Sequence, residues 1–312
     1  MCPRPLLVSV IAPIYGVERY IEKFADSVLS QSYPHIEFIF VNDGTKDHSI
    51  EILNDLIERK YSHLKSCINI VNKPNGGLPA ARRTGLEHAT GDYIYHVDSD
   101  DWLSPDAIEK IVDTIYRTGA DIVYFNFVKE YPNRPKSKRE RVYTSENKVQ
   151  YIRDMYNHRA YAAVWNKCVS SIIYTDNDLY TPPYGYAEDC CVTTQLVGYA
   201  KRIAYLDEEL YHYRKGNPGA LTGQQRKKRK REYALNFLGL YERYMNVEAK
   251  ENPVACIFDD IAIQAGWYSM IYGLGLFKEY KWLKGAIRKA KIHTDSDLFI
   301  LAQLLVKLRA WL

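Results

Sequence analysis

The stretch Tyr93-Ile94-Tyr95-His96-Val97-Asp98-Ser99-Asp100-Asp101 decides the fold and the kind of site that the chain carries. Its first half is a short apolar run typical of a buried strand, and its second half gathers three carboxylates directly after that strand. Neighbouring carboxylates out of water repel one another unless a positive charge lies between them. A divalent cation supplies that charge and often bridges substrate phosphates. The stretch therefore predicts a metal and diphosphate site at the carboxyl end of a parallel strand, where open α/β sheets bind ligands.

A structural interpretation of the same residues also exists. Asp101 or Ser104 suits the N-cap of a helix that begins at Pro105. The two interpretations are compatible, because Ser104 can cap the helix while Asp98 and Asp100 stay available to a ligand.

The flanking sequence alternates short apolar runs with helical patterns, which indicates a mostly parallel sheet with helices on both faces. The expected strands are residues 7–12, 36–41, 67–71, 93–97 and 120–128, and the expected helices are residues 18–30, 49–58, 78–89 and 105–117. The fold class that this pattern predicts is α/β.

The pattern changes near residue 130. Residues 131–139 are polar, basic and proline-rich, which is typical of a mobile surface loop, and residues 145–215 mix helix and strand patterns. Six basic residues follow at 226–231, and residues 232–312 have helical patterns rich in Trp, Tyr and Leu. We expect an α/β domain over residues 1–222, with halves at 1–118 and 119–222, and a helical region over residues 223–312.

The composition excludes several classes of protein. A net charge of +4 over 312 residues gives no reason to expect nucleic acid binding, and no apolar stretch has the length of a membrane span. Six cysteines without a Cys-x-x-Cys spacing indicate reduced thiols in the cytoplasm. A strand pattern follows Met1-Cys2-Pro3-Arg4 directly, so we expect no signal peptide.

Each loop that follows an expected strand offers a side chain suited to a nucleotide diphosphate. Tyr15 can stack on a base, Asp43 can accept a base N–H, and Arg82 can reach a phosphate or the base. Gly76-Gly77 lets the backbone approach a ligand closely. Each feature alone is also common in turns and helix entries, but all of them in this order before one Asp-x-Asp are specific.

These motifs resemble glycosyltransferase family 2, whose members adopt the GT-A fold. The segments that carry the resemblance are Val8-Ser9-Val10-Ile11-Ala12-Pro13-Ile14-Tyr15, Val41-Asn42-Asp43-Gly44-Thr45, Gly77-Leu78-Pro79-Ala80-Ala81-Arg82 and Asp98-Ser99-Asp100-Asp101, followed more loosely by Trp165-Asn166-Lys167, Glu188-Asp189 and Tyr211-His212-Tyr213-Arg214. Asn42 and Pro79 depart from the commoner residues of the family, which leaves Asp43 as the one base-reading carboxylate of its loop.

The resemblance implies roles for particular residues. Pro13, Tyr15, Asp43, Arg82, Asp98 and Ser99 would line the nucleotide and donor site. Asp100 would bind Mn²⁺ or Mg²⁺ under the diphosphate. Asp189 would be the general base for the acceptor hydroxyl. This role agrees with the chemistry, because in sugar transfer one carboxylate must accept the proton of the attacking hydroxyl. The structural alternative for Glu188-Asp189 is an acidic helix start.

Other residues carry weaker expectations. Lys167 and Arg214 suit a diphosphate or acceptor contact but equally a structural ion pair, and His212 suits a place near the metal. His96 and Trp165 are expected to pack in the interior, as are Cys190 and Cys191. The basic run 226–231, with Trp267, Phe277, Trp282 and residues 298–306, suits either contact with an anionic membrane or a helical subdomain or dimer contact.

The resemblance implies an inverting, metal-dependent glycosyltransferase that uses a nucleotide-sugar donor, usually a UDP-sugar. Its acceptor would be a saccharide or lipid-linked saccharide of a cell-surface polysaccharide such as capsule, and its place the cytoplasm or the inner face of the membrane. A nucleotidyltransferase is the first alternative, but it needs a glycine-rich basic loop after the first strand, which residues 13–18 lack. A non-catalytic nucleotide-sugar-binding protein is the second. A dinucleotide oxidoreductase is disfavoured because no Gly-x-Gly-x-x-Gly follows that strand.

Overall fold

The computed structural model describes residues 4–132, 138–140, 142, 145–156, 159–217, 226–248, 250–291, 306–307 and 310. Most of the expected basic loop at 131–139 lies outside these residues. The domain boundary near 222 and residues 298–305 of the apolar C-terminal run lie wholly outside them. The division of the chain at residue 222 therefore stays a proposal.

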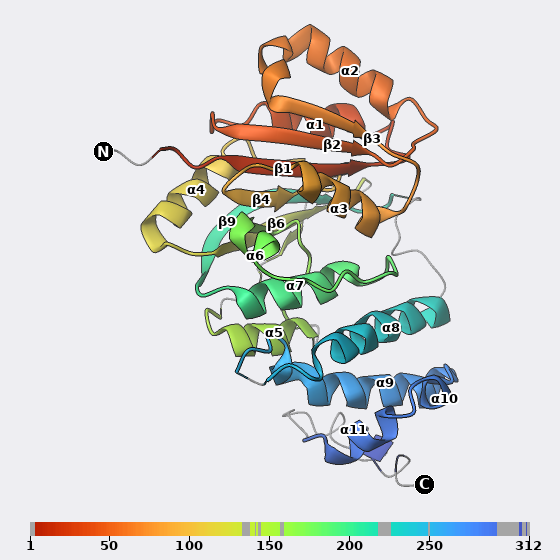
Figure 1. Ribbon diagram of the computed structural model, residues 1–312. Helices are drawn as coiled ribbons and strands as arrows, with labels where there is room; N and C mark the ends of the chain where they lie inside the picture. Colours follow the sequence, from red (N-terminus) through yellow and green to blue (C-terminus); the bar gives the residue numbers. More distant parts are fainter. Residues whose placement is uncertain are drawn as a thin grey trace.

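One mixed sheet forms the centre of the molecule (Figure 1). Its strand order is β3-β2-β1-β4-β8-β6-β9-β5, with β7 paired to β6. The strands are β1 (Val8–Ile14), β2 (Ile36–Asn42), β3 (Ile68–Asn72), β4 (Tyr93–His96), β5 (Trp102–Leu103), β6 (Ile122–Glu130), β7 (Lys138–Glu140), β8 (Lys167–Ser170) and β9 (Ile203–Arg214).

Most of these strands run in one direction. The pairs β1–β2, β2–β3, β1–β4 and β6–β9 are parallel. The strand β8 is antiparallel to both of its neighbours, β4 and β6, so β6 and β9 point the same way as β4. The prediction of an α/β fold with a mostly parallel sheet is confirmed.

Helices cover both faces of this sheet. They are α1 (Ile21–Leu29), α2 (Ser49–Lys60), η1 (Ser62–Cys67), α3 (Leu78–His88), α4 (Ala107–Thr118), α5 (Lys148–Tyr156), α6 (Ser171–Thr175) and α7 (Glu188–Tyr199). The strand β1 is buried on both faces: Val10 lies in the same apolar cluster as Phe24 of α1, and Ile11 lies with Ala81 of α3 in a second cluster. A strand buried on two sides has to be continuously apolar, which explains its sequence.

The expected cap of the fourth helix is wrong. Helix α4 begins at Ala107, after an N-cap residue, Asp106, whose side chain makes no capping hydrogen bond. Ser104 Oγ donates instead to the carbonyl of Glu209 at 3.0 Å. The carboxylate of Asp101 accepts hydrogen bonds from residues of β9. Contacts with β9 therefore engage the two side chains that the local sequence predicts as helix caps.

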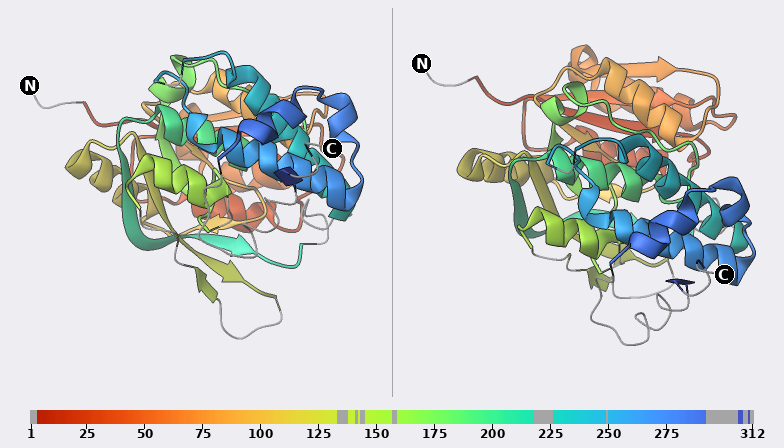
Figure 2. Two further views of the ribbon diagram at one scale, coloured as in Figure 1. Left: turned by 90° about the horizontal axis from the view of Figure 1, so that it is seen from below. Right: turned by 60° about the horizontal axis from the view of Figure 1, so that its bottom comes forward.

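The C-terminal helices extend the core away from the sheet. They are α8 (Arg226–Tyr244), η3 (Ala255–Ile257), α9 (Phe258–Tyr272), α10 (Leu276–Glu279) and α11 (Leu283–Lys289). In Figure 1, α8 lies below α7 and beside α5, and α9, α10 and α11 follow below them; the right-hand view of Figure 2 also shows these blue helices beside the green ones. Phe237 of α8 packs on Tyr156 of α5 with ring centroids 4.9 Å apart. One apolar cluster therefore continues from the sheet into these helices.

The basic run takes part in contacts between these helices. Arg231 forms an ion pair with Glu279 at 2.8 Å, and Lys230 donates to the hydroxyl of Tyr268 at 2.9 Å. Trp282 stacks on Tyr241 at 4.6 Å between centroids. Within the described residues, no helix is long and apolar enough to cross a membrane.

Candidate active site

The loops that follow β1 and β4 lie against each other at the carboxyl ends of the strands. Tyr15 comes directly after β1 and is 54% exposed, so its ring is free to meet a ligand. Ser99 is buried, and its hydroxyl donates to the carbonyl of Pro13 at 2.6 Å. Pro13 and Ser99 therefore hold the two loops together, and Ser99 has already used its hydroxyl hydrogen on the protein.

Asp43 ties the loop after β2 to the loop after β3. Its carboxylate is buried and accepts hydrogen bonds from the backbone N–H groups of Gly76 and Gly77, at 2.9 and 2.8 Å. The ammonium group of Lys73 forms an ion pair with the same carboxylate. A base N–H would therefore have to share these oxygens with three donors of the protein.

The loop after β4 is braced by the end of β9. The hydroxyl of Tyr211 donates to Asp101 Oδ2 at 2.7 Å, and the backbone N–H of Arg214 donates to Oδ1 at 2.6 Å. Arg214 Nε also donates to the carbonyl of Asp100 at 2.8 Å, and Asn217 Nδ2 donates to Asp100 Oδ2 at 2.7 Å. Arg214 thus supports the backbone of this loop from the neighbouring strand.

The electrostatics of this loop favour a cation. Burial raises the pKa of Asp100, and the neighbouring charge of Asp98 raises it further. Burial raises the pKa of Asp101 well above its usual range. A bound divalent ion would relieve both penalties, and carboxylate oxygens are the ligands that Mg²⁺ and Mn²⁺ prefer. Asp98 and Asp100 therefore fit a metal chemically, although no group of three metal-binding side chains stands together among the described residues.

Arg82 joins this loop to the start of α7. Its side chain is buried, with Nη2 2.8 Å from Asp98 Oδ1 and Nη1 in contact with Glu188 Oε1. Burial lowers the pKa of Arg82, but the charges of Glu188 and Asp98 outweigh this and raise it above its ordinary value. The guanidinium is therefore a fixed positive charge between two carboxylates that lie far apart in the sequence.

Glu188 and Asp189 begin α7 and differ in their surroundings. Glu188 is buried and paired with Arg82. Asp189 is half-buried, and its Oδ1 accepts the N–H of Cys190 at 2.8 Å. Burial raises the pKa of Asp189, while the charge of Arg82 opposes the shift. A half-buried carboxylate with a raised pKa is suited to accept a proton.

The polar groups of two predicted site residues are bound to other parts of the protein. Lys167 is buried, and its Nζ donates to the carbonyls of Tyr161 and Ala163 and to Asn166 Oδ1, at 2.8–3.0 Å. Because an ammonium group has three hydrogens, none remains for a diphosphate. Burial lowers the pKa of Lys167 to about 7. Its role is to support the segment before β8.

The ring of His212 is held by other residues than the carboxylates that fit a metal. Its ring stacks on Trp102 at 5.2 Å between centroids, Nδ1 lies 2.9 Å from Glu130 Oε1, and Nε2 lies 3.4 Å from Ser104 Oγ. Both ring nitrogens therefore have protein partners. His96 and Trp165 pack in the interior as expected, the latter stacked on Tyr211 at 4.4 Å.

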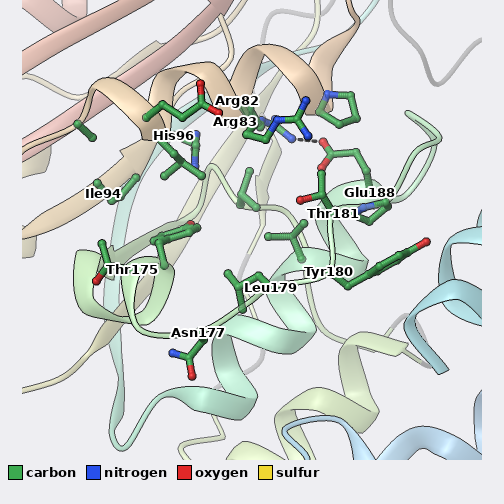
Figure 3. A pocket seen from close by; sticks show the side chains of 18 of the residues that line it. Arg82, Arg83, Ile94, His96, Thr175, Asn177, Leu179, Tyr180, Thr181 and Glu188 are labelled. Carbon is green, nitrogen blue, oxygen red and sulfur yellow. Dashed lines mark hydrogen bonds and ion pairs between the residues drawn. The ribbon is translucent and has the colours of Figure 1, made fainter. Parts of the chain in front are cut away.

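A pocket of about 330 Å³ lies beside the Arg82–Glu188 pair (Figure 3). Helix α3, strand β4, helix α6 and the segment that leads to α7 enclose it, and Figure 3 shows Arg82 and Glu188 pointing toward each other at one end of it. The wall includes Leu86, Ile94 and Leu179. Pockets of this size hold small organic ligands.

Three residues of the site carried no prediction: Lys73, Asn217 and Asn236. Lys73 directly precedes Pro74-Asn75-Gly76-Gly77, so its place beside Asp43 has a local signal. Asn217 and Asn236 act across more than 50 residues, on Asp100 and on Tyr184. No local pattern marks either of them.

Comparisons with known proteins show which family the chain is similar to. A family model described as "Glycosyl transferase family 2" matches residues 9–179. The chain is 35% identical over 222 residues to the "Uncharacterized glycosyltransferase EpsJ" of Bacillus subtilis (strain 168), a match that covers 69% of this chain and 63% of that protein. It is 29% identical over 307 residues to the "Minor teichoic acid biosynthesis protein GgaB" of the same organism, covering 94% of this chain and 33% of GgaB.

The chain spans less than two thirds of the length of the first relatives that it matches: 63% of EpsJ, 30% of a Streptococcus pneumoniae "Glycosyltransferase GlyA" and 60% of the "Putative glycosyltransferase EpsH" of B. subtilis. Among solved structures, S. aureus TarS 1-349 in complex with UDP-GlcNAc aligns with a TM-score of 0.65 and 20% identity, over 97% of this chain and 91% of that chain. The mannosyltransferase PcManGT from Pyrobaculum calidifontis, in complex with GDP-Man and Mn²⁺, aligns with a TM-score of 0.56 and 17% identity, over 99% and 84%. These likenesses confirm the GT-A fold.

Proposed function

The chain belongs to glycosyl transferase family 2, and from this premise we propose that it moves a sugar from a nucleotide diphosphate to a hydroxyl group with inversion at the anomeric carbon. That the protein is a glycosyltransferase follows from its family. The nucleotidyltransferase and non-catalytic alternatives lose their support with it.

The observation that carries the mechanism is the division of carboxylates around Arg82. Asp98 and Asp100 stand on one side, where burial and mutual repulsion favour a cation and a diphosphate. Asp189 stands beside Glu188 on the other, half-buried and with a raised pKa. We assign donor binding to the first group and proton acceptance to Asp189.

In this mechanism Asp189 takes the proton of the acceptor hydroxyl, and the hydroxyl oxygen attacks the anomeric carbon. The bond from that carbon to the diphosphate oxygen breaks, and the nucleotide leaves with the electron pair. Asp98 and Asp100 would hold a divalent ion, which neutralises charge on the departing diphosphate. Arg82 keeps Glu188 paired, so Asp189 is the carboxylate available as base. Tyr15 offers an exposed ring for the base of the donor.

The donor that we propose is a UDP-sugar. The structural neighbour TarS binds UDP-GlcNAc, which supports this choice, whereas the neighbour PcManGT binds GDP-Man and Mn²⁺. We propose Mn²⁺ or Mg²⁺ as the cofactor on the same ground. The acceptor that we propose is a saccharide, free or lipid-linked, of a cell-surface polymer, because GgaB is a teichoic acid biosynthesis protein.

We propose a cytoplasmic location with contact to the inner face of the membrane through the helices after residue 222. Lys227 and Lys228 at the start of α8 remain exposed, which leaves positive charge for an anionic surface. Sedimentation with vesicles of anionic and of neutral lipid tests this. Binding to the anionic vesicles that Lys227→Glu/Lys228→Glu removes would support it, and equal failure to bind either vesicle would contradict it.

The function itself is tested by nucleotide release from UDP-, GDP- and dTDP-sugars with Mn²⁺, because such enzymes hydrolyse their donor slowly when no acceptor is present. We expect metal-dependent release from a UDP-sugar by the wild type and none by Asp100→Ala. Absence of release from every donor, together with absence of UDP binding by calorimetry, would contradict the proposal.

A further inference from the structure

A left-handed residue stands directly before the proposed base. Ala187 has φ +60°, the one positive φ of a non-glycine residue among those described, and it is the N-cap of α7. This conformation is strained for an L-residue, so it persists only where the surroundings impose it. The side chain of Ala187 makes no capping hydrogen bond. The interactions that stabilise this turn must therefore come from other residues.

One buried side chain of α8 makes such interactions through hydrogen bonds. Asn236 is fully buried, and its Nδ2 donates to the carbonyls of Tyr184 and Tyr186 at 2.9 and 3.1 Å. Its Oδ1 accepts the N–H of Tyr184 at 3.3 Å. One amide thus satisfies three backbone groups in the three residues before Ala187.

A second buried amide holds the same segment further upstream. Gln195 of α7 accepts the N–H of Tyr180 at 2.7 Å and donates to its carbonyl at 2.9 Å. Gly239 of α8 faces Tyr180, and an added Cβ there would lie 2.1 Å from the Tyr180 hydroxyl oxygen. Residues 180–187, which we call the strap, are therefore fixed at two points, and both involve α8 or α7.

We propose that Asn236 is a positioning residue for transfer: it fixes the strap and the turn at Ala187, and so sets the direction in which Asp189 leaves the start of α7. The C-terminal helices then complete the catalytic site without touching the substrate. This inference rests on the proposed role of Asp189 as the base. It goes further by assigning part of the site to α8, which lies outside the segment 9–179 that the family model matches.

The hold of Asn236 on the strap is tested by a measurement that does not depend on activity: hydrogen–deuterium exchange in the wild type, Asn236→Ala and Asn126→Ala. Asn126 is the matched control, because it is also a buried amide with three hydrogen-bond partners, Asp207, Val142 and Tyr205, none of them in the strap. We expect Asn236→Ala to speed exchange of strap amides about tenfold or more, since a buried hydrogen-bonded network is lost. The Asn126 variant should leave strap exchange at the wild-type rate.

The catalytic consequence is tested by kcat against donor affinity. A misplaced base lowers kcat by about 10²-fold, while calorimetric Kd for the donor nucleotide stays within about twofold of the wild type. A purely structural defect would lower the active fraction and leave kcat per active site unchanged. If Asn236→Ala does not fold, Asn236→Asp carries the test, because it keeps the acceptor for Tyr184 and loses both donations.

Unchanged strap exchange in the Asn236 variant would overturn the inference, as would a loosened strap with wild-type kcat, or a loss of donor affinity equal to the loss of kcat. Absence of nucleotide release by the wild type would instead contradict the proposed function. The exchange measurement would still decide whether Asn236 holds the strap.

Discussion

The loop after β4 and the start of α7 both present neighbouring carboxylates, three in the loop and two in the helix, but the chain holds them in different ways. The loop after β4 continues directly from a sheet strand, and β9 braces it through Tyr211 and Arg214. The start of α7 has no strand behind it and depends on Arg82 from one side and Asn236 from the other. The first region is built into the sheet, whereas the second is assembled from three distant segments, so substitutions should separate the two.

The largest separation is expected from Asp189→Asn. Loss of a general base lowers kcat about 10²–10⁴-fold, while the donor side around Asp100 remains intact, so nucleotide affinity should stay within about twofold. Steady-state kinetics with saturating donor and calorimetry measure the two effects. Asp113→Asn, on the exposed side of α4, is the control and should match the wild type. A parallel fall of affinity and kcat in Asp189→Asn would mean that the two regions are not separate.

Arg82→Ala should damage both regions at once. It leaves Glu188 buried without its ionic partner, and breaking a buried pair from one side costs about 3–5 kcal/mol. We expect a loss of unfolding free energy of that size in urea, measured by circular dichroism. Arg83→Ala, the adjacent arginine of α3, is the control and should change stability far less. A stable Arg82→Ala protein would show that the bridge between the regions carries little energy.

Gly85→Ala tests the packing of α3 on the sheet, which positions Arg82 between Asp98 and Glu188. An added Cβ at Gly85 would lie 2.2 Å from Ile11 Cγ2 of β1, so the helix has to move away from the sheet. Overpacking of this kind costs about 1–3 kcal/mol. Gly285→Ala meets no atom within 4 Å and serves as the control. Thermal unfolding distinguishes the two, and equal melting temperatures would contradict the tight contact.

The pH profile of kcat gives the smallest effect. The base works when deprotonated, so the rate rises with pH through the pKa of Asp189, which burial raises above the ordinary 3.8. Arg82, the N–H of Cys190 and Lys167 lower the pKa of Asp189, and the charge of Asp98 raises it. The charge of Asp189 in turn raises the pKa of Glu188, so the two carboxylates repel each other. Glu188→Gln removes a negative neighbour and frees Arg82, so the acid limb should move to lower pH. A limb that stays in place or moves to higher pH would be inconsistent with Asp189 as the base.

The same contrast explains what the sequence reveals. Apart from η1 and β5, which carried no prediction, the elements up to β6 follow apolar runs and helical periodicity, so their order and the parallel sheet are predictable. Tyr15, Asp43 and Asp98 lie in loops that follow strands directly, so the position of each at the carboxyl edge comes with the strand. Arg82 lies in helix α3, which begins after the loop that follows β3.

The remaining features depend on pairings that no local pattern encodes. Asp101 caps nothing because β9, more than 100 residues later, supplies its hydrogen-bond donors. His212 pairs with Glu130 and Trp102 because β9 lies beside β6 and β5. Lys167 has a basic side chain suited to phosphate, but two backbone carbonyls and the side chain of Asn166 in the preceding segment accept all three of its hydrogens. Burial and pairing between residues override chemistry that the sequence alone offers.

The central claim is that Asp100 serves the donor and Asp189 serves the acceptor. Calorimetric titration of the wild type, Asp100→Asn and Asp189→Asn with UDP and Mn²⁺ tests it most directly. Loss of a charged contact of about 1.5–3 kcal/mol should weaken nucleotide binding by Asp100→Asn about 10–100-fold, whereas Asp189→Asn should bind UDP like the wild type. Equal weakening in both variants, or wild-type affinity in Asp100→Asn, would contradict this division.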